Sequence, residues 1–551
     1  MNPKLKSFLK SDAGLILGII LLSAIPRIFL LLVTHRFSND GISYLSIVLY
    51  LREPGLFDET PKRIYMILYP FLTMILDFAL RDLVLSARII NLFIGLAIPP
   101  VAFMLGRKLI SRNVGIIAAI FCVVNPSLIE QSVETRGDNL FALLTLLSIY
   151  VFESLDWFKP KVRDSLLLAL MIGLTQLTRT NGVMYLLVVI PIWLFWVMKG
   201  KINKKEFLFK TLIPFVFLFI VISSVPQILL YKRGYSMPSM FIYTYLDGNI
   251  AALHEREDIF FNLNEDATDY QFLEDVEKAD FSTIIRNIDI LPKKYARNFV
   301  YLLRLVFDPV IELLLRLSLL LLPLLFYMFY YSGEIESPRS LRRLLFWAWP
   351  SFFILPAINI ENLYFLPWVP VMMIFLTWLI MTVSKLGILS RYRIIVISVL
   401  FLVVMIPSIS NTSGFLRDEA IYKNPYLETG EWIQSNTPDD SRIMARDPEV
   451  FFHAFRRGFR MPNEDLNRTL IFAKNKNINY LVFGPVEFDL RRELFVSSYE
   501  EVYKKGEESR LELVYSYDNK KDLVYVVKVH PEKIKPMEKE SVNDNEELPV
   551  K

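Results

Sequence analysis

The chain has 551 residues, of which 53% are hydrophobic and 21% charged, and its formal net charge is +4. So apolar a composition excludes an ordinary soluble enzyme and favours a multi-span membrane protein, and nothing in the charge balance indicates a nucleic-acid partner. The one cysteine, Cys122, and four scattered histidines exclude an intramolecular disulfide and a zinc site built on Cys and His.

The N-terminal part of the chain predicts a retained first span. Three lysines precede an apolar run that is too long for a signal peptide and lacks a small-residue cleavage site. Stretches of this kind, each long and apolar enough to cross a bilayer, recur about eleven times. They lie near 13–34, 86–106, 113–130, 139–156, 164–179, 182–198, 208–230, 308–331, 344–358, 364–384 and 393–410. A further apolar stretch at 65–80 is expected to form a helix along the membrane surface.

Clusters of basic residues occur in every second connection between the predicted spans. They are Arg107, Lys108 and Arg112; Lys159, Lys161 and Arg163; Lys199, Lys201, Lys204 and Lys205; Arg339, Arg342 and Arg343; and Lys385, Arg391 and Arg393. The positive-inside rule places these loops and the N-terminus in the cytoplasm. An odd number of spans then puts the chain beyond residue 411 outside, and the acids of the opposite loops face outward.

Beyond residue 411 the composition becomes that of a soluble α/β domain. The pattern predicts a helix at 425–437 and strands at 442–445, 479–483, 511–517 and 523–529. The charged end of the chain is expected to be disordered. The predicted organisation is a transmembrane domain at 1–410, an extracytoplasmic α/β domain at 411–532 and a disordered tail at 533–551. Within the loop 231–307, the acidic run from Glu255 to Asp280 is interpreted as a solvated helical face.

Asp40 follows the end of the first apolar helix directly. A carboxylate at the membrane boundary can accept a proton while one substrate stays anchored in the bilayer, but the alternative is a solvated loop Asp beside a turn residue, Gly41. Arg27 lies inside the apolar span, where an ionised guanidinium costs about 2.5–3.5 kcal/mol. It must therefore face the bundle interior, as a partner for an acid of the outer cavity, or snorkel to lipid phosphates.

Two further outer connections carry charges at helix ends. Asp138 opens the fourth predicted span, where an acid also suits the first helical turn, and Arg136 precedes it by two residues. Arg179 lies between the fifth and sixth spans. A guanidinium suits bidentate recognition of phosphate, although Arg at a helix end is also a common interfacial anchor.

The first and last outer loops add weaker candidates. Lys62 and Arg63 could clamp a phosphate headgroup, or hold the surface helix on anionic lipid. Glu361 and Tyr364 lie in the tight connection between the ninth and tenth spans, where the alternative is an ordinary aromatic belt.

The order of these features resembles the membrane glycosyltransferases of the GT-C fold, in particular bacterial relatives of protein O-mannosyltransferases and aminoarabinose transferases (glycosyltransferase family 39-like). The matching residues are Arg27, Asp40 and Tyr44; Tyr69-Pro70; Asn125-Pro126; Asp138; Leu177-Thr178-Arg179; and Glu361, Tyr364, Pro367 and Pro370. The chain departs from the family at three points, one of which is the absence of the Pro-Pro that often precedes Tyr-Pro. Gly41 stands where the family often has Glu, and Leu363 stands where it has the Arg of an Arg-Tyr pair.

The resemblance implies a mostly α, polytopic membrane bundle with a soluble α/β domain on the outer side. It implies transfer of a sugar from a polyprenyl-phosphate donor to a protein, lipid or glycan acceptor at the outer face of the cell membrane. Asp40 and Asp138 would be the catalytic carboxylates, Arg179, Arg136, Lys62 and Arg63 would bind the donor phosphate, and Arg27, Tyr44, Glu361 and Tyr364 would support the site. No cofactor is certain. Some relatives use a divalent cation, and Asp40 and Asp138 could share one.

Two other functions fit a protein of this class. A transporter or flippase of lipid-linked sugars would place its ionisable groups near the bilayer midplane and often has paired repeats, whereas here the acids gather at one face. A scaffold whose C-terminal domain binds a partner would leave the polar outer loops of the bundle unexplained.

Overall fold

The computed structural model describes residues 11–35, 38–52, 66–231, 262–270, 292, 295–300, 339–353, 365–384, 391–422, 424–485, 492–502, 509–518 and 522–535. The chain forms two compact units, Met1–Ala251 with Ala279–Lys423, and Ala252–Lys278 with Asn424–Lys551. The domain boundaries derived from the sequence stay a prediction.

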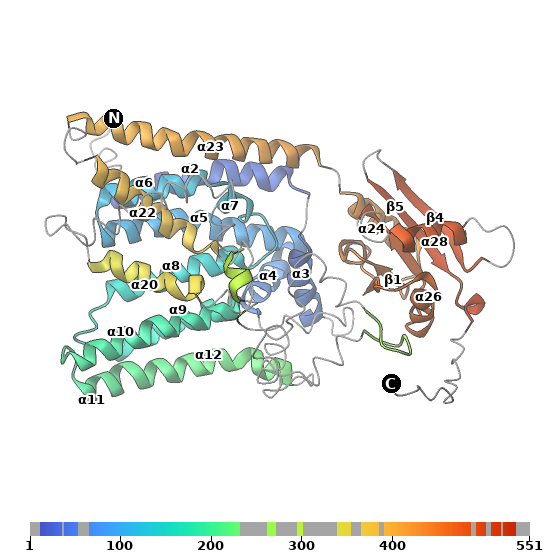
Figure 1. Ribbon diagram of the computed structural model, residues 1–551, viewed down its shortest axis with the longest axis horizontal. Coiled ribbons are helices and arrows are strands. Elements are labelled where there is room, and N and C mark those ends of the chain that lie inside the picture. Colours follow the sequence, from blue (N-terminus) through green and yellow to red (C-terminus); the bar gives the residue numbers. More distant parts are fainter. Residues whose placement is uncertain are drawn as a thin grey trace, which may run out of the picture. The chain divides into compact units, whose positions relative to one another are not determined.

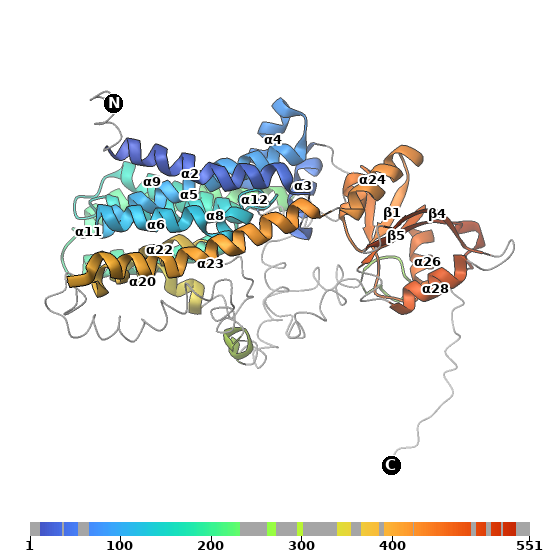
Figure 2. The same cartoon turned by 90° about the horizontal axis from the view of Figure 1, so that it is seen from above.

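The first unit is a bundle of helices that run side by side (Figures 1 and 2). Its elements are α2 Asp12–Val33, α3 Asn39–Arg52, α4 Leu68–Leu80, α5 Leu83–Leu109, α6 Arg112–Val124, α7 Pro126–Glu130, α8 Asp138–Ser154, α9 Val162–Thr178, the 3₁₀ helix η2 Thr180–Tyr185, α10 Leu186–Met198, α11 Lys204–Glu206, the π-helix η3 Phe207–Leu212, α12 Ile213–Tyr231, α20 Arg339–Phe353, α22 Trp368–Val383 and α23 Arg393–Ile421.

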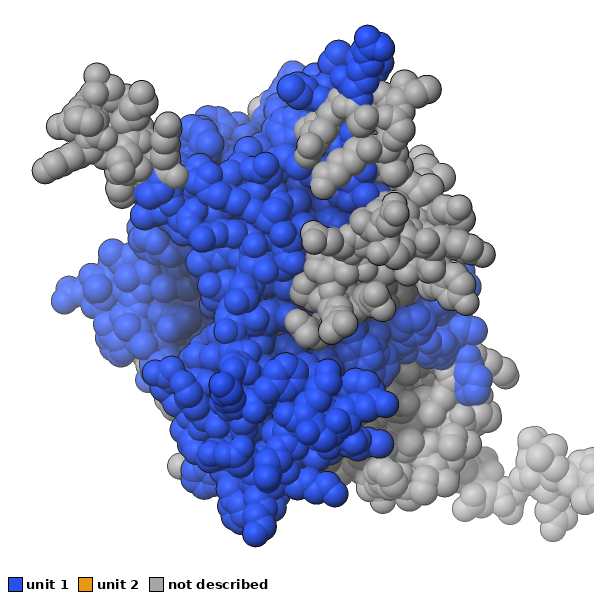
Figure 3. Space-filling view, turned by 90° about the vertical axis from the view of Figure 1, so that its left-hand side faces the viewer, with its two compact units in different colours: residues 1–251, 279–423 blue, residues 252–278, 424–551 orange. Residues whose placement is uncertain are grey.

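Four helical stretches in the described part of the chain are long and apolar enough to cross a membrane: Asp12–Val33, Leu83–Leu109, Thr180–Met198 and Lys204–Val225. Large apolar side chains remain exposed on their outer faces, Leu32 and Phe217 among them. An exposed apolar face of this kind suits lipid rather than water. The first unit, seen in Figure 3 from the end opposite α3, is therefore the membrane bundle of a multi-pass protein.

One predicted span is broken in two. The stretch expected at 113–130 forms α6, which ends at Val124, and the short helix α7, which starts at Pro126. The residue before a proline is disfavoured in a helix, and Asn125 instead starts α7 by accepting a hydrogen bond from the Leu128 N–H at 3.1 Å. The span expected near 308–331 lies outside the described residues.

The second unit contains a five-stranded sheet in the order β2-β1-β3-β5-β4. The strands are β1 Arg442–Ala445, β2 Arg457–Arg460, β3 Tyr480–Phe483, β4 Leu511–Asp518 and β5 Leu523–Val529, and the helices are α24 Pro425–Asn436, α25 Glu449–His453, α26 Leu466–Asn475, α28 Arg492–Val502 and the 3₁₀ turn η7 Pro531–Lys533. Strand β1 pairs in parallel with β2 and β3, while β5 pairs antiparallel with β3 and β4. Helix α24 covers one side of the sheet and α26 and α28 cover the other (Figure 2).

The predicted helix and the four predicted strands of this unit are confirmed, and β2 was not predicted. Its sequence places arginines at both ends of a four-residue strand, so it lacks a run of β-branched residues. The interpretation of the acidic loop as a helical face is wrong for residues 262–270. These form a turn closed by a bridge between Leu263 and Tyr270, and both side chains join the core of the second unit. The packing of residues 262–270 on a core formed far along the chain leaves no local pattern from which this turn could be predicted.

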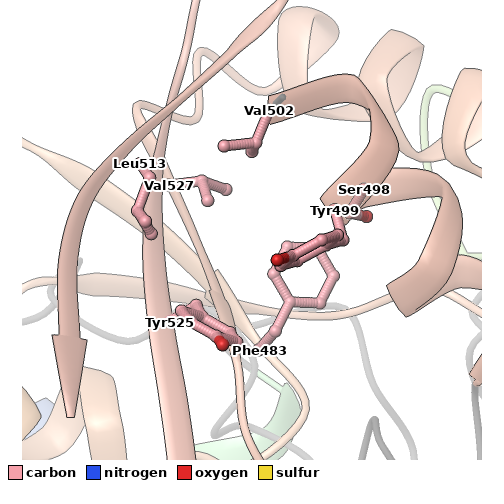
Figure 4. A pocket seen from close by; sticks show the side chains of 7 residues that line it. All are labelled: Phe483, Ser498, Tyr499, Val502, Leu513, Tyr525 and Val527. Carbon is pink, nitrogen blue, oxygen red and sulfur yellow. The ribbon is translucent and has the colours of Figure 1, made fainter. Parts of the chain in front are cut away.

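A small apolar hollow lies between α28 and the strands β4 and β5 (Figure 4). It is lined by Phe483, Ser498, Tyr499, Val502, Leu513, Tyr525 and Val527.

Candidate active site

Asp40 lies in the first turn of α3. The helix begins after Ser38, whose Oγ accepts a hydrogen bond from the Gly41 N–H at 3.0 Å. The positive end of a helix favours an ionised carboxylate. The Asp40 side chain is 26% exposed, so the group stays accessible at the end of the bundle where α3 lies (Figure 1). The alternative of a loop Asp beside a turn glycine is excluded, because Asp40 and Gly41 both lie within the helix α3.

Arg136 joins the two predicted catalytic acids. Its Nη2 donates to Asp40 Oδ2 at 2.7 Å, and its Nε donates to Asp138 Oδ2 at 3.1 Å. The Arg136 side chain is 13% exposed and Asp138 is 1% exposed. A single guanidinium thus holds acids that lie 98 residues apart in the chain.

Arg179 completes the arrangement, because its Nη1 donates to Asp138 Oδ1. Both side chains are buried, so the interfacial-anchor interpretation of Arg179 is excluded. Charged groups so poorly exposed require opposite partners, and Asp138 is held between two guanidinium groups. The structure thus brings together four of the predicted site residues in the order Asp40, Arg136, Asp138 and Arg179, and we name these four side chains the ion-pair chain.

Two glycines allow the loop that carries Arg136 to lie close against α3 and α5. A Cβ added at Gly41 would lie 2.2 Å from Thr135 Oγ1, and one added at Gly95 would lie 2.4 Å from Ser132 Cβ. A side chain at residue 95 would therefore displace Ser132 of the loop, and one at residue 41 would displace the Thr135 hydroxyl. The loop between α7 and α8 rests on α3 one residue after Asp40, and on α5 at Gly95.

Arg27 faces the bundle interior and is fully buried. Its guanidinium donates to the carbonyl oxygens of Ser23 at 3.1 Å, Val123 at 3.1 Å and Cys122 at 3.3 Å. Cys122 and Val123 lie where α6 ends, so Arg27 satisfies carbonyls that the break before Pro126 leaves without a helical partner. These contacts differ from both sequence interpretations, since backbone carbonyls take the place of an acid or of lipid phosphates.

Tyr44 is buried on α3 and packs edge-to-face on Tyr69, with ring centroids 5.7 Å apart. The Tyr69 hydroxyl donates to the Ala87 carbonyl at 3.0 Å, which ties α4 to α5. The other four predicted site residues, Lys62, Arg63, Glu361 and Tyr364, lie outside the described residues.

The sequence interpretation missed a second set of buried polar residues behind the ion-pair chain. Arg88 Nη1 donates to the Thr34 carbonyl at 2.9 Å, and Thr34 Oγ1 donates to Glu419 Oε2 at 2.6 Å. Burial raises the pKa of the Glu134 carboxyl, against the opposing effects of Arg136, a hydrogen bond from Ser38 and Arg88. The available signal was the presence of polar residues such as Arg88 inside an otherwise apolar predicted span.

The ion-pair chain does not fit a cation shared by Asp40 and Asp138, because Arg136 bonds to both carboxylates. Within the described ranges, no group of three or more His, Cys, Asp or Glu side chains is placed to hold a metal ion.

The sequence of part of the bundle matches a known family. Residues 67–226 match the family described as dolichyl-phosphate-mannose-protein mannosyltransferase. This segment contains Arg136, Asp138 and Arg179, while Asp40 precedes it. No curated protein sequence matches the chain.

Two solved structures share the architecture of nearly the whole chain. ArnT from Cupriavidus metallidurans, bound to undecaprenyl phosphate, is 12% identical with a TM-score of 0.58, and the match covers 96% of this chain and 100% of that one. The archaeal oligosaccharyltransferase AglB from Archaeoglobus fulgidus, in complex with an inhibitory peptide and a dolichol-phosphate, is 13% identical with a TM-score of 0.55, covering 94% of this chain and 74% of that one. At such identities the likeness shows the fold. The resemblance to GT-C membrane glycosyltransferases derived from the sequence is confirmed.

Proposed function

We propose that the chain transfers a sugar from a polyprenyl-phosphate-linked donor to an acceptor hydroxyl. The proposal is supported by the GT-C fold and by the match of residues 67–226 to the mannosyltransferase family. The observation that carries the proposal is the ion-pair chain. It joins a partly exposed carboxylate, Asp40, to the guanidinium groups of Arg136 and Arg179 at one end of an apolar bundle. A sugar phosphate on a lipid needs this combination of a base, cations and a membrane-embedded scaffold.

The two acids have different exposures and therefore different tasks. Asp40 is 26% exposed and is the base that takes the proton of the acceptor hydroxyl, while Asp138, at 1%, holds Arg136 and Arg179. The acceptor oxygen attacks the anomeric carbon as the bond from that carbon to the phosphate oxygen breaks. Polyprenyl phosphate leaves with the bonding electrons and the configuration inverts.

Arg179 and Arg136, together with Lys62 and Arg63, stabilise the departing phosphate in this proposal. Arg27 and Tyr44 support the site through the packing described above, and Glu361 and Tyr364 keep the supporting role that the resemblance implies. Guanidinium groups held in place before the reaction stabilise the developing charge at no cost of reorganisation.

Helix α5 supports placing the site on the outer face. It has 27 residues and therefore spans about 40 Å. Arg88, near its start, lies beside the site, whereas Arg107 and Lys108 lie in its last turn. Basic residues mark the cytoplasmic end of a span, so the site lies at the opposite, extracytoplasmic end. With about eleven spans and a cytoplasmic N-terminus, the α/β unit would also lie outside.

The test is transfer of radiolabelled sugar from a panel of polyprenyl-phosphate donors by purified protein in detergent. A general base contributes about 10²–10⁴-fold, so Asp40→Asn should lose about that factor. Asp156→Asn is the matched control, because Asp156 is exposed at the other end of α8 and accepts a hydrogen bond that Asn can also accept. Full activity of Asp40→Asn would refute its role as base. Movement of uncleaved donor across liposomes, equal in wild type and variant, would favour the transporter.

A further inference from the structure

Asn91 is a fully buried amide inside the apolar helix α5. Its Nδ2 donates to the carbonyl oxygen of Arg136 at 2.7 Å and to the carbonyl oxygen of Glu134, and it lies 3.2 Å from the Tyr69 hydroxyl. The two hydrogens of the amide thus engage two carbonyls of the loop between α7 and α8, on either side of Thr135. Asn91 thus bonds to the backbone of Arg136 and to none of the four charged side chains of the ion-pair chain.

The chemistry of these partners requires an NH₂ group at this position. Both loop partners are carbonyl oxygens, so a carboxylate or an amide turned the other way would place oxygen against oxygen. The Asn91 Oδ1 atom is buried without a hydrogen-bond partner. A buried polar atom left unsatisfied is unfavourable, and here its presence is explained by what the nitrogen does for the loop.

The loop that Asn91 holds also packs against the first turn of α3, which carries Asp40. Thr135 Oγ1 occupies the space where a side chain at residue 41 would begin, so the loop is held between α5 and the first turn of α3. The next residue, Arg136, then lies 2.7 Å from Asp40. The position of the Arg136 guanidinium therefore depends on the two bonds that Asn91 makes to the backbone.

We propose that Asn91 is a positioning residue of the transfer reaction, which holds Arg136 against Asp40 through the carbonyls of residues 134 and 136. The inference rests on the proposed function. Asn91 touches neither donor nor acceptor, and it acts through the placement of Arg136. A misplacement of about 1 Å can cost about 100-fold in rate, so loss of the clamp should reduce kcat by about 10–100-fold.

A double-mutant cycle separates this role from a general loss of stability. The four proteins are wild type, Asn91→Leu, Arg136→Ala and the double variant, and kcat and KM for sugar transfer are measured for each. If Asn91 acts through Arg136, Asn91→Leu should cost about 10–100-fold in the wild-type background and less than about 3-fold in the Arg136→Ala background. Equal losses in both backgrounds would overturn the proposal.

Asn139→Leu is the matched control. Asn139 is also fully buried, and both polar atoms of its side chain lack a hydrogen-bond partner. Its replacement should change kcat by less than about 3-fold. An equal loss in Asn139→Leu and Asn91→Leu would overturn the specific role of Asn91. Should Asn91→Leu fail to fold, Asn91→Ser, which keeps one donor, replaces it in the same cycle.

Hydrogen exchange of the amides at 131–137 provides a readout that does not depend on turnover. Exchange should be faster in Asn91→Leu than in wild type, and unchanged in Asn139→Leu. Unchanged exchange in Asn91→Leu would refute the clamp. A wild-type protein that transfers no sugar but shows the expected exchange would refute the proposed function and leave the clamp in place.

Discussion

Replacement of Gly41 by alanine is expected to separate Arg136 from Asp40 without touching either side chain. A Cβ at residue 41 would lie 2.2 Å from Thr135 Oγ1 and 3.0 Å from Ser38 Oγ. Ordinary contacts begin at 3.4 Å, so the overlap with Thr135 is about 1.2 Å. Thr135 is buried, so unless its hydroxyl turns away, either the first turn of α3 or the loop that carries Thr135 must move by a comparable distance.

The size of the effect follows from this displacement. Overpacking of this kind costs about 1–3 kcal/mol of folding free energy. A shift of about 1 Å would also break the 2.7 Å bond between Arg136 and Asp40 and lower the transfer rate by about 100-fold. Activity should therefore fall much further than the amount of folded protein.

The assay is sugar transfer from the lipid-linked donor by wild type, Gly41→Ala, Thr135→Ala and the double variant. Thr135 Oγ1 has no hydrogen-bond partner, and the Thr135 Cβ would lie 3.5 Å from the new Cβ, which is an ordinary contact. Thr135→Ala should thus change the rate by less than about 3-fold and restore most of the activity lost in Gly41→Ala. Wild-type activity in Gly41→Ala, or no rescue in the double variant, would refute the reasoning.

Two further predictions concern stability. The Tyr270 hydroxyl donates to the Arg460 carbonyl at 2.6 Å and its ring packs on Phe472, so Tyr270→Phe should destabilise the second unit by about 1 kcal/mol and Tyr270→Ala by about 3–5 kcal/mol, measured by hydrogen exchange of β3 in the full-length protein. Equal exchange in all three proteins would show that the segment 262–270 contributes nothing to that core. Burial raises the pKa of Glu134 above 4.5, so the folded protein binds this proton more tightly than the unfolded chain and stability falls as the pH rises above about 4.5. The Tm of wild type relative to Glu134→Gln should therefore decrease as the pH is raised above the ordinary pKa of Glu, and a constant difference would contradict the raised pKa of this carboxyl.

The sequence determined the class of protein and most local elements, because these depend on residues close together in the chain. Apolar stretches of spanning length indicated the membrane bundle, and short runs rich in apolar residues indicated β1, β3, β4 and β5. The acids and arginines of the ion-pair chain were each recognised from their positions at helix ends. The break before Pro126 was signalled by Asn125-Pro126, although the predicted span ran through it.

Only the tertiary structure decided which of these groups meet. Asp40 and Arg136 are 96 residues apart, and their contact depends on the approach of Thr135 to Gly41 and on the two bonds from Asn91. No pattern in the sequence indicated that Arg27 would bond to carbonyls at the end of α6, or that residues 262–270 would join the core of the α/β unit. Such contacts arise where elements distant in the chain pack together, and a periodic pattern marks the buried face of an element but not the distant residue that this face contacts.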